Sequence, residues 1–101
     1  MKILSFNVNG IRAVVGKTFI EDMQAQAPDV ICLQETKATP EQVAAAVAPL
    51  SEYQVFANSA ERKGYSGTAI LTKVAPISVT YDIGLPDHDS EGRVICAEFD
   101  S

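Results

Sequence analysis

Two short apolar runs each end in a polar side chain that can bind a metal ion, and this feature constrains the fold most. Residues 2–6 run into Asn7, and residues 29–33 are followed by Gln34 and Glu35. Short runs rich in β-branched residues are typical of buried strands. A helix-compatible stretch separates them, so the strands are predicted to pair in parallel through a crossover. Parallel pairing brings Asn7 and Glu35 to the same sheet edge, where open α/β sheets bind ligands.

The segments between and after these strands predict two helices. Residues 18–21 (Thr-Phe-Ile-Glu) and residues 39–42 (Thr-Pro-Glu-Gln) both fit capping boxes at helix starts. Pro28 ends the first helix because the residue before a proline avoids the helical conformation. The apolar face of that helix would consist of Phe19, Met23 and Ala27.

Four later segments alternate or are apolar and predict strands that pair in antiparallel fashion: residues 53–57, 68–72, 77–81 and 93–99. The expected fold is α/β (α+β), a mixed sheet with helices on one face. Tyr53, Phe56 and Phe99 are interpreted as core residues. The face of the sheet away from the helices is also apolar, so an isolated chain of this kind is expected to self-associate.

Composition bounds the class of protein. With 101 residues and 47% hydrophobic content, the chain is expected to form one globular domain at most. It has no apolar run long enough for a membrane span and no signal-peptide pattern, so we expect no membrane partner and a cytoplasmic location. Cys32 and Cys96 fall within predicted strands and are interpreted as buried free thiols.

The net charge of −5 argues mildly against a nucleic-acid partner, but the placement of the cations weakens that argument. The acidic residues belong mainly to predicted helices and their flanks. The cations follow strands or occupy loops, where they could bind phosphate. These cations are Arg12, Lys17, Lys37, Arg62 and Lys63.

Glu35 is the sharpest candidate for chemistry. A single Glu after a strand is usually solvated, but here Asn7 ends the neighbouring strand. A carboxylate with an amide oxygen suits Mg²⁺, which commonly takes one or two carboxylates and keeps water for substrate phosphate. Residues 62–67 (Arg-Lys-Gly-Tyr-Ser-Gly) are either a hairpin loop or a phosphate clamp with an aromatic platform. Residues 87–89 (Asp-His-Asp) are interpreted as a solvated turn, without a metal.

Four blocks of the sequence together resemble the exonuclease III family of apurinic/apyrimidinic endonucleases, in the endonuclease/exonuclease/phosphatase superfamily. The blocks are residues 5–12 (Ser-Phe-Asn-Val-Asn-Gly-Ile-Arg), 33–37 (Leu-Gln-Glu-Thr-Lys), 64–67 (Gly-Tyr-Ser-Gly) and 91–94 (Glu-Gly-Arg-Val). The resemblance implies the N-terminal part of a four-layer αββα sandwich of the deoxyribonuclease I type. It also implies Mg²⁺ dependence, with Mn²⁺ as a substitute, and cleavage of double-stranded DNA 5′ to abasic sites or at 3′ ends.

Carried over by position, the resemblance makes Glu35 the metal-binding glutamate and Asn7 an asparagine that orients catalytic groups. Asn9 stands where some members have Asp, and it is predicted among the DNA-binding residues. The positions that resemble DNA-backbone contacts in relatives are Arg12, Lys17, Lys37, Gly64 and Tyr65, and residue reasoning adds Arg62 and Lys63.

The resemblance covers only the N-terminal portion of the family's single domain, residues 1–101 here. The family's active-site tyrosine, Asp-x-Asn pair and late Asp-His pair have no counterpart, so the isolated chain is expected to be inactive. Two alternatives stay open. One is a phosphatase of the same superfamily that acts on a small or lipid phosphate. The other is a truncated, non-catalytic domain that binds DNA or a protein partner.

Overall fold

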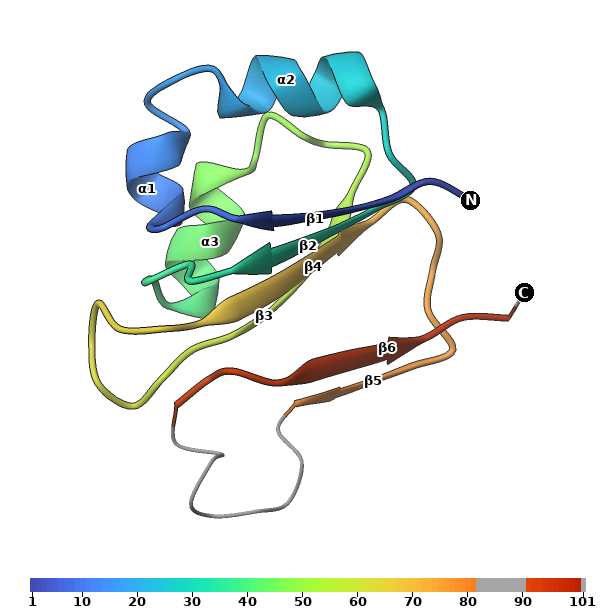
Figure 1. Cartoon of the computed structure of the whole chain (residues 1–101). Coiled ribbons are helices and arrows are strands. Elements are labelled where there is room, and N and C mark those ends of the chain that lie inside the picture. Colours follow the sequence, from blue (N-terminus) through green and yellow to red (C-terminus); the bar gives the residue numbers. More distant parts are fainter. Residues whose placement is uncertain (82–90, 101) are drawn as a thin grey trace.

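The computed structural model describes residues 1–81 and 91–100 (Figure 1). Its main sheet has four strands in the order β1 (Ile3–Asn7), β2 (Val30–Gln34), β4 (Thr68–Thr72), β3 (Gln54–Asn58). β1 and β2 are parallel, and the other neighbours are antiparallel. The predicted mixed sheet is therefore confirmed. Asn7 lies opposite Gln34, the residue before Glu35, so the parallel register brings the two candidate residues to one edge.

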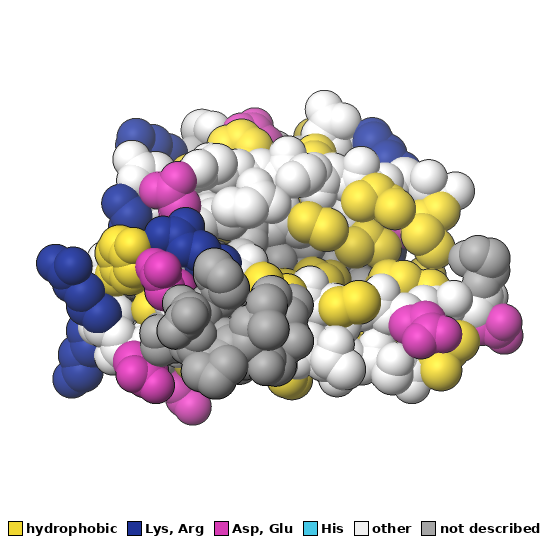
Figure 2. Space-filling view, turned by 60° about the horizontal axis from the view of Figure 1, so that its bottom comes forward, with side chains coloured by type: hydrophobic (Ala, Val, Ile, Leu, Met, Phe, Trp, Pro, Cys, Tyr) yellow, Lys and Arg dark blue, Asp and Glu magenta, His cyan; other side chains and the backbone are white. Residues whose placement is uncertain are grey.

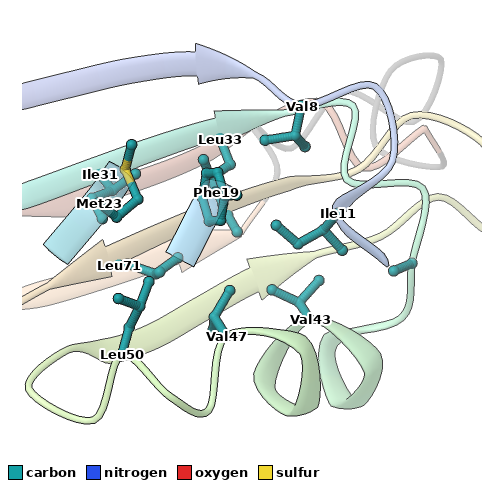
Figure 3. Packing of buried hydrophobic residues seen from close by; sticks show 12 residues of the cluster. Val8, Ile11, Phe19, Met23, Ile31, Leu33, Val43, Val47, Leu50 and Leu71 are labelled. Atoms are coloured by element: carbon teal, nitrogen blue, oxygen red, sulfur yellow. The ribbon is translucent and has the colours of Figure 1, made fainter. Parts of the chain in front are cut away.

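Three helices cover one face of this sheet: α1 (Ile11–Val14), α2 (Phe19–Gln26) and α3 (Pro40–Ala46) (Figure 1). The core lies between them and the sheet. In Figure 3, Phe19 and Met23 of α2 lie beside Leu33 and Ile31 of β2. Complete burial of such a side chain contributes about 1.5–3 kcal/mol. The remaining members of the cluster include Ile11, Val43, Val47, Leu50 and Leu71.

The two predicted capping boxes have different outcomes. At α3 the prediction is confirmed, because Gln42 N donates to Thr39 Oγ1 (3.2 Å) and Thr39 N donates to Gln42 Oε1 (2.9 Å). At α2 it is wrong. Thr18 is the N-cap residue, but its hydroxyl donates to Asp22 Oδ2 (2.9 Å) and accepts no backbone N–H. The local sequence allows Thr18 either to cap the backbone or to bind Asp22, and in the structure its hydroxyl binds the Asp22 carboxylate one helical turn later.

α2 ends before Pro28, as predicted. Ala27 adopts a left-handed conformation with φ 47°, and its N–H donates to Met23 O (2.9 Å). That turn carries Ala27 out of the helical period. Its side chain is consequently exposed, whereas the sequence predicted it on the buried face beside Phe19 and Met23.

Strand β1 is not buried as predicted, whereas β2 is. Ile3 is 62% exposed on the face that the helices do not cover. Phe6, on the opposite face, contacts Phe19 of α2 but stays 41% exposed because β1 is an edge strand. Strands β5 (Ser78–Tyr81) and β6 (Ile95–Glu98) also depart from the prediction. They pair with each other in a separate two-stranded sheet, below the main sheet in Figure 1.

The predicted burial of the cysteines holds only in part. Cys32 on β2 is half-buried, and this burial raises the pKa of its thiol. Cys96 on β6 is exposed, because the short second sheet has open faces. Both thiols are free. Tyr53, Phe56 and Phe99 are half-buried. Tyr53 packs against the core cluster as expected, whereas Phe56 and Phe99 are not among the residues that do so.

Two further sequence interpretations concern residues 87–89 and membrane spans. The Asp-His-Asp triplet at residues 87–89 lies outside the described residues. Within the described part of the chain, no helix is both long and apolar enough to cross a membrane.

Candidate active site

Asn7 and Glu35 meet at the ends of β1 and β2. The Asn7 side-chain amide Nδ2 donates to Glu35 Oε2, and Asn7 Oδ1 accepts the backbone N–H of Asn9 (3.0 Å). The contact through Nδ2 fixes the direction of the carboxylate. In the described part of the chain, Glu35 Oε1 accepts no hydrogen bond, so one carboxylate oxygen stays available to a ligand.

Lys37 adds a cation to this corner. Its ammonium Nζ donates to Asn9 Oδ1 (2.6 Å), and its carbonyl oxygen accepts a hydrogen bond from Arg12 Nη2 (3.1 Å). Asn9 therefore connects Asn7 to Lys37, and Lys37 connects this corner to Arg12. A cation close to the carboxylate favours binding of an anionic group, such as a phosphate, at the same edge.

The backbone of residues 35–37 joins three loops. Glu35 O and Thr36 O accept the N–H groups of Gly10 (2.8 Å) and Ile11 (2.9 Å). In the other direction, the N–H groups of Thr36 and Lys37 donate to the carbonyls of residues 67 (3.1 Å) and 66 (2.7 Å). These bonds hold residues 35 and 37 in the left-handed conformation, with φ 55° and 53°. Such a conformation costs a non-glycine residue about 1–3 kcal/mol and persists only where the surroundings impose it.

Gly67 packs directly on Thr36. A Cβ at Gly67 would lie 2.4 Å from Thr36 Oγ1, and its φ of 91° is itself unsuited to other residues. Thr36 is fully buried, and its hydroxyl has no hydrogen-bond partner among the described residues. The loop that carries Tyr65 is thus seated against the residue next to Glu35, with no space between them.

A groove of about 540 Å³ opens beside this corner, between α3 and the β3–β4 loop. Three of the predicted cations line it: Arg12, Arg62 and Lys63. Gly64 and Tyr65 form part of the same wall. Figure 2 shows most Lys and Arg side chains of the visible face gathered toward one end of the molecule. A protein with net charge −5 therefore presents a locally basic groove.

Tyr65 is held by charged neighbours. Arg62 lies over its ring, with Cζ 5.3 Å from the centroid, and Arg93 lies 5.5 Å from the same centroid. The Tyr65 hydroxyl donates to Glu91 Oε2 (2.9 Å) and accepts from Arg93 Nη2 (2.8 Å). Cation–π contacts of this kind contribute about 0.5–1 kcal/mol each at exposed sites.

The structure brings together most of the sequence-predicted residues, but not all. Asn7, Asn9, Glu35 and Lys37 form the corner described above, and Arg12 joins it to the groove. Lys17 belongs to neither group: it lies exposed in the turn between α1 and α2. Sequence reasoning gave no role to Thr36 or Arg93. Both stand within recognised motif blocks, so their place in those blocks was the available signal.

The residues at this corner fit a hard divalent cation. Glu35 offers a carboxylate oxygen, a ligand that Mg²⁺ accepts while keeping waters for a substrate phosphate. Asn7 Oδ1, the second ligand that the sequence predicts, accepts the Asn9 N–H in the structure. Within residues 1–81 and 91–100, no three Asp, Glu, His or Cys side chains come together, so Zn²⁺-type coordination has no ligand set there. The Asn7 contacts suit an orienting role, because its Nδ2 already holds the Glu35 carboxylate.

Comparison with known proteins agrees with this geometry. The sequence model of the Endonuclease/Exonuclease/phosphatase family matches residues 4–101. The DNA repair nuclease APEX1 of Danio rerio is 46% identical over 101 residues, which is 98% of this chain and 33% of that protein. The exodeoxyribonuclease of Bacillus subtilis is 48% identical over 102 residues, which is 100% of this chain and 39% of that protein. The chain thus spans only 33% and 39% of these two curated relatives.

A solved structure shows the same fold. The AP endonuclease from Archaeoglobus fulgidus superposes with a TM-score of 0.82 at 30% sequence identity, over 98% of this chain and 37% of that one. The resemblance indicated by the four motif blocks is thereby confirmed. This chain belongs to the endonuclease/exonuclease/phosphatase family, is similar to its apurinic/apyrimidinic endonucleases and exodeoxyribonucleases, and has their deoxyribonuclease I-like fold.

Proposed function

We propose that this chain forms the metal-binding corner and one DNA-contacting wall of a Mg²⁺-dependent DNA repair nuclease. The reaction is hydrolysis of the phosphodiester 5′ to an abasic site in double-stranded DNA. The main support is that Glu35, held by Asn7, lies at the same edge as a groove lined by Arg12, Arg62 and Lys63. The exodeoxyribonuclease among the relatives favours a second activity of the same site, removal of nucleotides from 3′ ends.

Each residue has a part that follows from its contacts. Glu35 would hold Mg²⁺ through its carboxylate, which Asn7 keeps in place through Nδ2. When bound there, the ion would offset the negative charge that develops on the scissile phosphate. Lys37 and Arg12 place further positive charge beside it. The cations of the groove bind the DNA backbone through phosphates and fix its register without reading sequence.

We propose further that these residues alone do not cleave DNA. Hydrolysis also requires a group that activates water, and within residues 1–81 and 91–100 no three Asp, Glu, His or Cys side chains come together, at Glu35 or elsewhere. The loss of cooperating catalytic groups typically removes most of the rate. The chain should therefore bind divalent cation and DNA without Mg²⁺-dependent incision.

The test is Glu35→Gln in the full-length protein that carries this chain. The substitution keeps the shape and removes the charge, so Mg²⁺-dependent nicking of an abasic duplex should fall by about 10²–10³-fold, as with loss of one transition-state stabiliser. Mn²⁺ binding, followed by electron paramagnetic resonance on the 101-residue chain, should weaken in parallel. Glu41→Gln, on the exposed surface of α3, is the matched control and should change neither. Near wild-type cleavage by Glu35→Gln at saturating Mg²⁺ would overturn the assignment.

A further inference from the structure

A short segment before β6 is fastened to the tip of the β3–β4 loop. Arg93 Nη2 donates to the Tyr65 hydroxyl (2.8 Å), and Arg93 also pairs with Glu91 Oε2 (3.3 Å). The Tyr65 hydroxyl donates to that same carboxylate oxygen (2.9 Å). Tyr65, Glu91 and Arg93 therefore form a closed triangle of hydrogen bonds, which we call the Tyr65 clamp. These hydrogen bonds raise the pKa of Arg93 above its ordinary value, and the bond with Tyr65 has the largest effect.

The clamp is anchored on the main sheet by backbone contacts. Gly92, between its two charged members, has φ 61°, and its carbonyl accepts from Thr68 Oγ1 (3.2 Å). A Cβ at Gly92 would lie 2.3 Å from the carbonyl carbon of Ser59. Two residues further on, the Val94 carbonyl accepts from Asn58 Nδ2 (2.9 Å). The segment thus rests on the first residues of the β3–β4 loop while its side chains hold the tip of that loop.

Arg93 holds the groove wall but does not line the groove. Tyr65, Arg62 and Lys63 are lining residues, whereas Arg93 is not. Arg62 lies over the Tyr65 ring, so the orientation of the ring also sets the position of a cation that faces the groove. Residues 59–67 are mostly small or polar, and ordering such a loop at the moment of binding would cost affinity. The hydrogen bonds of the clamp would hold this loop in its binding conformation before DNA binds.

We propose that Arg93 is a positioning residue for DNA binding: through Tyr65 and Glu91 it fixes the aromatic wall of the groove, without itself contacting the DNA backbone. This inference rests on the proposed function, and it names how the DNA-contacting loop is kept in its binding conformation. It distinguishes Arg93 from Arg62 and Lys63, which line the groove and to which the proposed function gives direct phosphate contacts.

The test measures DNA affinity by fluorescence anisotropy with EDTA present, using a labelled duplex that carries a stable abasic analogue. Salt is varied from about 50 to 200 mM, because loss of one direct phosphate contact lowers the slope of log K against log salt by about one. Arg93→Gln should weaken binding roughly 3- to 10-fold with the slope unchanged, since only preorganisation is lost. Arg62→Gln, the matched control, should lower the slope by about one. Arg93 is exposed, so its variants should fold, and circular dichroism verifies this.

Two further variants sharpen the result. Arg93→Lys keeps the charge but lacks the planar group that spans Tyr65 and Glu91, so its affinity should match that of Arg93→Gln. On a Tyr65→Ala background, Arg93→Gln should have no further effect on affinity. Rescue of affinity by lysine, a lowered salt slope for Arg93→Gln, or additive effects in the double variant would each overturn the proposal.

Failure of the proposed function has a different signature. It would leave the wild-type chain without measurable affinity for the duplex at any salt concentration. Wild-type binding that Arg93→Gln leaves unchanged overturns only the positioning role. Nuclear Overhauser contacts between the Tyr65 ring and the Arg93 side chain in the free protein test the clamp without DNA, and their absence would also overturn it.

Discussion

Gly67→Ala should destabilise the protein because the new methyl group brings both backbone strain and a steric clash. At φ 91° an L-residue is strained, which costs about 1–2 kcal/mol. The new Cβ would also lie 2.4 Å from Thr36 Oγ1, and overpacking of a close-packed site costs about 1–3 kcal/mol. Together the free energy of unfolding should fall by about 2–5 kcal/mol. That is a large part of the roughly 5–15 kcal/mol that stabilises a typical domain.

Gly64→Ala is the matched control, since it separates the two penalties. Gly64 also has a positive φ, 69°, but a Cβ there would meet nothing within 4 Å. It should show only the conformational penalty, about 1–2 kcal/mol, so the difference between the two variants measures the steric one. Thr36→Ala removes the obstructing hydroxyl, which has no hydrogen-bond partner among the described residues. Combined with Gly67→Ala it should restore about 1–3 kcal/mol.

The assay is urea unfolding of all four variants followed by circular dichroism, with the unfolding free energy taken from the midpoint and slope. Equal stability of Gly67→Ala and Gly64→Ala would refute the close contact between Gly67 and Thr36. So would a double variant in which the two substitutions are simply additive. In either case the seating of the Tyr65 loop beside Glu35 would need another physical basis.

Three further predictions concern other elements. Thr39→Ala removes the α3 cap and should lower the unfolding free energy by about 1 kcal/mol, whereas Thr18→Ala should cost less, because its hydroxyl caps no backbone N–H; equal losses would contradict this. A thiol reagent should modify exposed Cys96 faster than Cys32, whose pKa is raised by burial. A reversed order of labelling would refute this assignment. Because burial raises the pKa of Cys32, its contribution to stability is complete below its ordinary pKa of 9.0 and is lost as pH rises through the higher folded value. Sedimentation velocity should detect self-association of the isolated chain through the exposed apolar side chains of β1, among them Ile3, and a monodisperse monomer at high concentration would exclude it.

The sequence by itself determined the features that depend on neighbours along the chain. The cap at Thr39, the helix end before Pro28 and the strand at residues 68–72 all follow from local patterns, and the structure confirms them. The meeting of Asn7 with Glu35 was also predictable. Parallel pairing of two strands leaves their ends only one possible edge, so a local pattern carried long-range information.

Tertiary structure alone decided which of several possible partners each polar side chain took. Thr18 could cap its helix or bond to Asp22, and nothing in the sequence distinguished these hydrogen bonds. Lys17 and Arg12 looked equivalent as loop cations, but only Arg12 reaches the groove.

The role of Thr36 and the clamp around Tyr65 were likewise decided by the fold. Arg93 and Tyr65 are separated by 28 residues in the chain, and Gly67 packs on Thr36 from a distant loop. Such contacts depend on backbone approach at the ångström scale. Sequence patterns specify which face of an element is buried, and close packing then determines which atoms touch.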